Sequence, residues 1–238
     1  MKKNMLTVAL VFCAMVMFTG CPEPANVPTE QTEQNEQTVT TADGITVAVP
    51  IVTLPNLPAS VGEDPFAGKT FRYEITYVDN TTWYDDFIFA SDGTVNETKH
   101  DSTYEDSYIY EYSYDATKLY MRYKYLEWVD PVTGEVTEYV TPQEYINLSS
   151  AYMAEHIYDI ICGSDGGSKE EALEYYNGNK SYYDEKSGGS TFEDYVEFCL
   201  QWYIKVEAGM VGNLYEYTYT ENSFTRGSNG YTYTLLAN

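Results

Sequence analysis

Residues 104–128 read YEDSYIYEYSYDATKLYMRYKYLEW, and this stretch decides the fold. Tyrosine occupies every second position over 108–114, and an extended strand places such alternate side chains on one face. The polar residues Asp115–Lys118 follow and suit a hairpin loop. A second apolar row of the same period comes next and consists of Leu119, Met121, Tyr123 and Tyr125. The stretch predicts a long antiparallel β-hairpin with one aromatic face.

Shorter alternating stretches surround this hairpin and predict further strands. They lie at 71–77, 83–90, 94–99, 135–141, 214–220, 223–226 and 231–236. Aromatic residues make up 16% of the chain, and such a composition favours strands because rings pack well on a pleated surface. An antiparallel meander of about nine strands tends to close on itself, since closure removes exposed edges.

The hydrophobic period changes to a helical one between residues 142 and 206. Thr141 and Glu144 form a capping box with Pro142 at the first helical position, and further helices are expected to start near Ser168 and Thr191. The end of the third helix is ambiguous, because residues 203–206 also suit a strand. The predicted fold class is mainly β with a helical insert: an antiparallel up-and-down barrel of about eight to nine strands, with three helices inserted before the closing strands. An open sheet packed against three helices is the alternative.

The first residues carry a targeting signal. Lys2 and Lys3 precede an apolar run over 6–18, which is too short to span a membrane comfortably. The following residues 18–21, Phe-Thr-Gly-Cys, resemble the lipobox of bacterial lipoproteins, although Phe18 replaces the usual leucine. The resemblance implies cleavage before Cys21, a diacylglyceryl thioether on its sulfur and acylation of the new amino group with chains such as palmitate. The alternative is an ordinary secretory leader with a coincidental cysteine.

The expected organisation follows from these signals. Residues 1–20 form a lipoprotein signal peptide, and 21–63, rich in Pro, Glu, Gln and Thr, form a disordered tether. Residues 64–238 form the β domain with its helical insert at 142–206. The expected location is the bacterial cell envelope outside the cytoplasm, with the outer membrane favoured over the inner. The formal net charge of −24 argues against nucleic-acid binding, because phosphate backbones are repelled.

Three parts of the β stretch carry a second resemblance. They are Gly68–Phe71, Phe89–Thr94 and Tyr112–Asp115, and together they resemble small bacterial lipocalin-like domains. These domains open with a glycine and an aromatic residue, then show an aspartate-glycine turn and a tyrosine-rich hairpin. The resemblance covers residues 66–141 and the C-terminal strands. The helical block departs from a plain lipocalin-like meander.

An aromatic barrel face suits a small hydrophobic or amphipathic ligand, since tyrosine offers a flat ring and a hydroxyl. The alternative is that the tyrosines simply fill the core. The residues to test for ligand binding are Trp83, Tyr108, Tyr110, Tyr112 and Tyr123.

The remaining cysteines, Cys162 and Cys199, either form a disulfide or stay as buried thiols. No histidine neighbours either cysteine in sequence, so a nucleophilic role is disfavoured. The two histidines, His100 and His156, fall short of the ligand count of a zinc site, and no cofactor motif is present.

The expected function is therefore that of a non-enzymatic, lipid-anchored envelope protein that binds a small or amphipathic ligand, or a protein partner, through an aromatic barrel. The first alternative is a structural or surface-antigen lipoprotein with a packed core and no ligand. The second is a hydrolase, which requires two carboxyl groups facing each other across a cleft, with the pKa of one raised.

Overall fold

A computed structural model describes residues 37–78, 80–100, 105–164, 166–226 and 230–236. The leader and Cys21 lie outside these residues. The chain divides into two compact units, each described by itself. The barrel unit comprises Ile51–Asp130, Glu135–Ile146 and the chain from Glu207 onward. The helical unit comprises the described residues up to Pro50, Pro131–Gly134 and Asn147–Val206.

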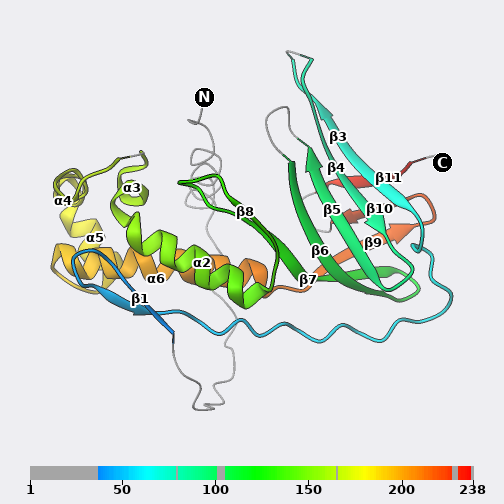
Figure 1. Cartoon of the computed structure of the whole chain (residues 1–238), viewed down its shortest axis with the longest axis horizontal. Helices are drawn as coiled ribbons and strands as arrows, with labels where there is room; N and C mark the ends of the chain where they lie inside the picture. The colour runs from blue at the N-terminus through cyan, green and yellow to red at the C-terminus, as the bar shows by residue number, and fades with distance from the viewer. Residues whose placement is uncertain (1–36, 79, 101–104, 165, 227–229, 237–238) are drawn as a thin grey trace. The chain divides into compact units, whose positions relative to one another are not determined.

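Eight antiparallel strands close the barrel, in the order β6-β5-β4-β3-β11-β10-β9-β7, with β6 pairing back onto β7 (Figure 1). Each strand pairs with its neighbours along the chain, and β11 pairs with β3, which is up-and-down topology. A ninth strand, β8 (Val136–Val140), pairs with β7 outside the closed wall. The predicted barrel is thus confirmed. Its strands are β3 (Thr70–Thr76), β4 (Thr82–Phe89), β5 (Thr94–His100), β6 (Glu105–Tyr114), β7 (Lys118–Val129), β9 (Tyr215–Thr220), β10 (Ser223–Arg226) and β11 (Thr232–Leu235).

Aromatic side chains fill the barrel interior. Tyr110, Tyr112 and Tyr114 are at most 8% exposed and Tyr108 packs against them, so the predicted tyrosine face points inward. Phe224 lies near the centre of the core and stacks on Tyr233 with ring centroids 4.7 Å apart. The other phenylalanines of this core are Phe66, Phe71, Phe87 and Phe89. Ring packing of this kind stabilises the interior beyond the burial of area alone.

The second predicted row is wrong at its last member, Tyr125. The pairing of β6 with β7 shifts register, because Tyr110 faces Tyr123 whereas the preceding residue, Ile109, faces Tyr125. Lys124 is therefore an extra residue, and such a β-bulge reverses the faces of the residues that follow it. Tyr125 consequently lies on the outside of the wall, and Leu126, 3% exposed, takes the inward position.

The segment 51–66 is ordered and belongs to the barrel unit, which differs from the tether expected up to residue 63. Hydrogen bonds to strands of the barrel unit hold its backbone: the Arg122 side chain donates to the Pro55 carbonyl at 2.6 Å, and the Val61 amide donates to the Tyr114 carbonyl at 3.0 Å. Phe66 then enters the core and is 1% exposed. The prolines of this segment exclude a central strand, but they permit an extended chain held by distant side chains.

Residues 37–49 also depart from the expected tether. Strands β1 (Thr38–Thr40) and β2 (Thr46–Ala48) form a small antiparallel sheet in the helical unit. Asp43, in the turn between them, accepts a hydrogen bond from Tyr158 and pairs with Lys169 at 3.3 Å. The first half of the expected tether, up to residue 36, lies outside the described residues.

Five helices follow β8, where three were expected. They are α2 (Pro142–Glu155), α3 (Ile157–Cys162), α4 (Lys169–Gly178), α5 (Lys180–Ser187) and α6 (Phe192–Val211). The capping box of Thr141 with Glu144 is confirmed, and a second one joins Ser168 with Glu171. Helix α5 carries no apolar period, and it is held by a salt bridge of Lys180 with Asp184 at 2.9 Å.

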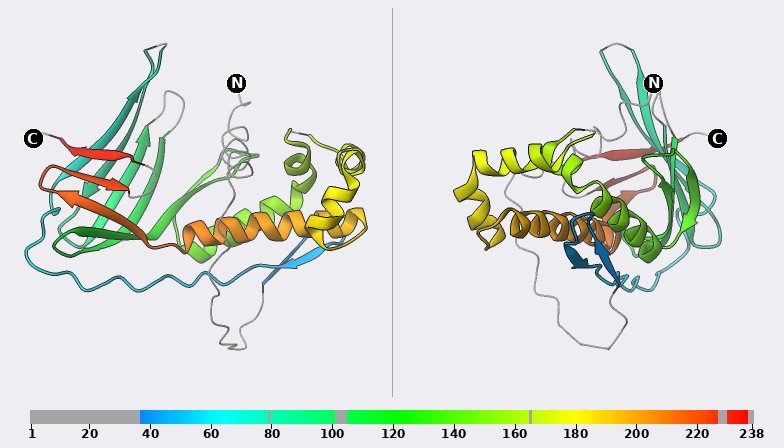
Figure 2. Two further views of the ribbon diagram at one scale, coloured as in Figure 1. Left: turned by 180° about the vertical axis from the view of Figure 1, so that it is seen from behind. Right: turned by 60° about the vertical axis from the view of Figure 1, so that its left-hand side comes forward.

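The start of α6 anchors the shorter helices of the helical unit (Figure 2). Tyr195 of α6 packs against Tyr176 of α4 and Tyr183 of α5, with ring centroids 5.4 and 4.6 Å apart. Helix α6 continues through residues 203–206, which removes the strand alternative there. Cys162 and Cys199 are both free thiols, so the disulfide alternative is not seen. Burial raises the pKa of the Cys199 thiol to about 11, which leaves it a poor nucleophile.

Candidate functional site

A buried charged cluster lies inside the barrel. Its acids are Asp85 of β4 and Glu97 of β5, which are 2% and 4% exposed. Lys99 is the register partner of Asp85 and lies 3.4 Å from the Glu97 carboxylate. Tyr110 donates a hydrogen bond to Glu97, and Tyr233 donates one to Asp85 at 3.1 Å. Alternation along the strands explains this arrangement, because each of these residues occupies an inward position.

Burial changes the titration of Asp85 and of Lys99 in this cluster. Burial, and next the charge of Glu97, raise the pKa of Asp85 to about 9. Asp85 is therefore protonated at neutral pH, and its hydrogen bond is the one that it accepts from Tyr233. Burial works against the charge of Lys99, but Glu97 and the neighbouring tyrosines outweigh it and raise the pKa of Lys99 well above its usual value. Lys99 therefore keeps its charge and pairs with Glu97.

The charged cluster does not have the geometry of a hydrolase. A pair of carboxyl groups that hydrolyses a glycosidic bond is separated by about 5 to 9.5 Å and is open to substrate and water. Both acids of the cluster are covered by the surrounding side chains. The cluster contains a carboxyl group with a raised pKa, which a hydrolase requires. Asp85 and Glu97 do not face each other across an open cleft, which a hydrolase also requires.

The five residues expected to bind a ligand do not form one site. Tyr108, Tyr110 and Tyr123 belong together, with the ring of Tyr123 4.5 Å from Tyr110 and 5.9 Å from Tyr108. The ring of Tyr112 packs against that of Phe66, with centroids 6.2 Å apart, and the Tyr112 hydroxyl donates a 2.7 Å hydrogen bond to Asp64. Trp83 packs on Tyr73, 5.8 Å away. Each of these rings packs against other aromatic rings, which favours a filled barrel interior over an open ligand cavity.

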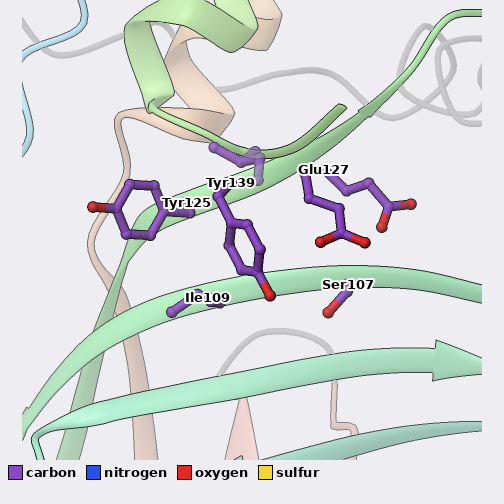
Figure 3. A pocket seen from close by; sticks show the side chains of 7 residues that line it. Ser107, Ile109, Tyr125, Glu127 and Tyr139 are labelled. Carbon is purple, nitrogen blue, oxygen red and sulfur yellow. The ribbon is translucent and has the colours of Figure 1, made fainter. Parts of the chain in front are cut away.

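A pocket opens on the outside of the barrel wall, where β6, β7 and β8 adjoin. It encloses about 270 Å³. Figure 3 shows the ring of Tyr139 between Tyr125 and Glu127, with its hydroxyl directed towards the strand of Ile109 and Ser107. We call this pocket the outer groove. Its lining residues are Ser107, Ile109, Tyr125, Leu126, Glu127, Glu138 and Tyr139.

Two irregularities of strand pairing, one with an extra residue in β7 and one with an extra residue in β8, adjoin the outer groove. The first is the bulge at Lys124, which turns Tyr125 outward. The second lies in the pairing with β8, where the register shifts between Leu126 and Trp128. Bulges re-aim side chains and bend strands, and they are frequent beside functional sites. Tyr139 of β8 has φ +61°, a left-handed conformation that is costly for a bulky residue.

The outer groove combines aromatic rings with carboxylates. The rings of Tyr125 and Tyr139 are 6.3 Å apart and perpendicular, so the edge of one meets the face of the other. Glu127 and Glu138 add two acids, and the Ser107 hydroxyl donates to Asn96 at 3.0 Å. Among the lining residues there is no Lys, Arg or His. Such a site can hold a small group by ring contact and by hydrogen bonds to the acids.

The strained backbone of Tyr139 allows a test of whether its side chain has a structural role or a binding role. We expect Tyr139→Gly to retain the fold and to raise the free energy of unfolding by up to about 1 kcal/mol, because glycine adopts a positive φ without strain and the ring is 62% exposed. Urea unfolding measures this. A clear loss of stability would assign the ring a structural role instead of a binding role.

The helical unit offers less chemistry. His156 lies 3.0 Å from Asp159 on one side of its ring, an i, i+3 pair. In the part of the chain that the structure describes, no three His, Cys, Asp or Glu residues are grouped to hold a metal ion. Among the helices of the described ranges, none is long and apolar enough to span a membrane.

Comparisons with known proteins do not identify the chain. It matches no protein-family model, and it has no significant match among curated proteins or solved structures. The geometry of the outer groove and the leader sequence are the observations that bear on function.

Proposed function

We propose that this chain is a lipid-anchored protein of the bacterial cell envelope, without catalytic activity, that binds a small ligand or a side chain of a protein partner in the outer groove. The observation that carries the binding function is the groove itself, in which two bulges and a strained tyrosine bring two rings and two acids together on the outside of the wall. Strain of this kind persists only where the surrounding structure maintains it, and it concentrates at functional sites.

The envelope location rests on the leader. A basic start, an apolar run and Phe-Thr-Gly-Cys at 18–21 support cleavage and lipidation at Cys21. Several acyl chains hold a protein stably on a membrane, because each buried methylene contributes about 0.8 kcal/mol. An acidic chain, with 37 Asp and Glu against 13 Lys and Arg, gains nothing from an anionic membrane surface, so the lipid provides the attachment.

The leader provides a matched pair of variants. We expect Cys21→Ser to block processing and to move the protein from the detergent phase to the aqueous phase in a phase-partition experiment. Cys13→Ser lies within the apolar run of the same leader and should change neither processing nor partition. If Cys21→Ser is processed and partitions like the unchanged protein, the lipid anchor is excluded.

A fragment screen tests the binding function. Ligand-observed NMR with the purified full-length protein should identify small molecules whose signals change with the unchanged chain and much less with Tyr139→Gly. Loss of every hit in the variant places binding in the outer groove. Hits that bind both forms equally, or an absence of hits, contradict the proposal.

The filled interior supports a second candidate, a structural or surface-exposed lipoprotein with no ligand. Phe66, Phe71 and Phe224 are at most 1% exposed, and their rings are in contact with other rings. This candidate predicts no hit in the fragment screen, whereas the binding function predicts hits that depend on Tyr139.

A further inference from the structure

We infer that the outer groove takes an organic cation, an alkylammonium or guanidinium group on a short aliphatic stem. This inference rests on the proposed binding function and names the chemistry of its ligand. The ligand is either a free amine or a basic side chain of a polypeptide, and both present the same cationic group.

The charges of the groove favour a cation. Glu127 and Glu138 line it, and none of its lining residues is basic. Lys124 lies on the adjacent bulge and is not part of the lining. The formal charge of −24 on the chain adds a long-range potential that concentrates cations and repels anions. An anionic ligand would be repelled both by Glu127 and Glu138 and by the net negative charge of the chain.

The rings of the groove offer the complementary surface. A cation within about 6 Å of a tyrosine face is attracted by the electron-rich ring. The barrel unit uses this contact repeatedly, since Arg72 lies 3.9 Å from the centre of the Tyr84 ring and Arg226 lies 4.9 Å from that of Tyr215. Tyr125 itself attracts Lys124, whose ammonium is 5.7 Å from the ring centre. The rings of Tyr125 and Tyr139, being perpendicular, present surfaces in two directions to a ligand.

The size of the groove limits the ligand to a small group. Its volume of about 270 Å³ lies just below the usual range of small-molecule sites, roughly 300 to 1,000 Å³. Ile109 supplies an apolar surface for the methylenes of a stem. A groove of this size suits one basic side chain or a small amine and is too small for an acyl chain.

Isothermal titration calorimetry of the full-length protein tests the charge requirement. The cationic probe is Nα-acetyl-arginine N-methylamide, and its control is the citrulline analogue, which has the same shape and no charge. We expect the arginine probe to bind at least about tenfold more tightly, and its affinity to fall as salt is raised. Cadaverine and a Gly-Ser peptide with one arginine form two further arms. Tighter binding of cadaverine indicates a free amine, and tighter binding of the peptide indicates a polypeptide.

Variants locate the effect. Glu138→Gln should lower the affinity for the arginine probe by roughly three- to tenfold. Glu74→Gln makes the same change of net charge on the exposed side of β3, and it should leave the affinity unchanged within twofold. Equal affinity for arginine and citrulline, with hits in the fragment screen, overturns the cation inference and leaves the binding function standing. No binding in any arm overturns the inference, and the screen then decides the binding function separately.

Discussion

Replacing Phe66 by alanine is expected to lower the free energy of unfolding of the barrel by about 3 to 5 kcal/mol, the usual cost of deleting a buried phenylalanine ring. Phe66 is 1% exposed and stacks on Phe89 with ring centroids 5.0 Å apart. Its position is fixed by Asp64, whose carboxylate accepts from the Phe66 amide at 2.8 Å and from the Tyr112 hydroxyl at 2.7 Å. Without the ring, a cavity remains between the aromatic residues of the core.

The measurement is urea unfolding followed by tyrosine and tryptophan fluorescence. Ile51→Ala in the same segment is the control, because Ile51 is 54% exposed and its loss should change stability by no more than about 0.5 kcal/mol. Limited proteolysis should also cut the segment 51–66 faster in Phe66→Ala. A Phe66→Ala protein as stable as the unchanged chain would mean that this segment is a tether after all.

The second large effect concerns Asp85. Its pKa is raised to about 9 in the folded state, from an ordinary value of 3.8. A carboxyl with a raised pKa binds its proton more tightly when folded, so its favourable contribution is full below pH 3.8 and is lost as pH rises towards 9. For one proton the loss is up to about 1.4 kcal/mol per pH unit. Asp85→Asn keeps the shape and the neutral charge, so it should remove this slope.

We therefore expect Asp85→Asn to be more stable than the unchanged protein at pH 7, by up to about 4 kcal/mol for the three pH units above 3.8, and equal to it near pH 4. Urea unfolding at pH 4, 6 and 8 measures the difference. The adjacent Asp86 provides the opposite control, because its carboxylate forms two 2.6 Å hydrogen bonds with Arg72, so Asp86→Asn should lower stability. Parallel pH profiles of Asp85→Asn and the unchanged protein would contradict a protonated Asp85.

Local patterns predicted most of the barrel. The alternation of tyrosines from 108 to 114, the loop at Asp115 and the short strands at both ends correspond to elements of the structure, and Ser223–Arg226 is matched at both ends. The closed up-and-down arrangement was predicted from strand number. The strand periodicity of two is a local property, so it can be read without knowledge of distant contacts.

The outer groove could not be predicted in the same way. The row that ended at Tyr125 fails because one extra residue, Lys124, changes the face, and a bulge leaves no mark in a period-two pattern. Tyr139 was expected within a strand, but its positive φ depends on the pairing of β8 with β7. The segment 51–66 lacks any period, and it is ordered by partners that lie far away in sequence, such as Arg122 and Tyr114.

The sequence also does not predict which acidic residues are buried inside the barrel. Asp85 and Asp86 are adjacent in sequence, yet alternation directs one into the barrel and the other to Arg72 on the outside. The sequence contains 37 acids, and nothing in it marks Asp85 and Glu97 as two that become buried. The pairing of β4 with β5 places them on neighbouring strands, and β11, which reaches β4 through β3, adds Tyr233.

We expect binding to take place on the outside of the barrel wall while the interior stays filled. Two-dimensional NMR of the isotope-labelled protein, titrated with the arginine probe, tests it most directly. The account predicts shift changes at residues 107–109, 125–127 and 138–139 and none at Glu97, Tyr110 and Tyr233. Shift changes centred on those three interior residues, with the outer groove unaffected, would contradict it.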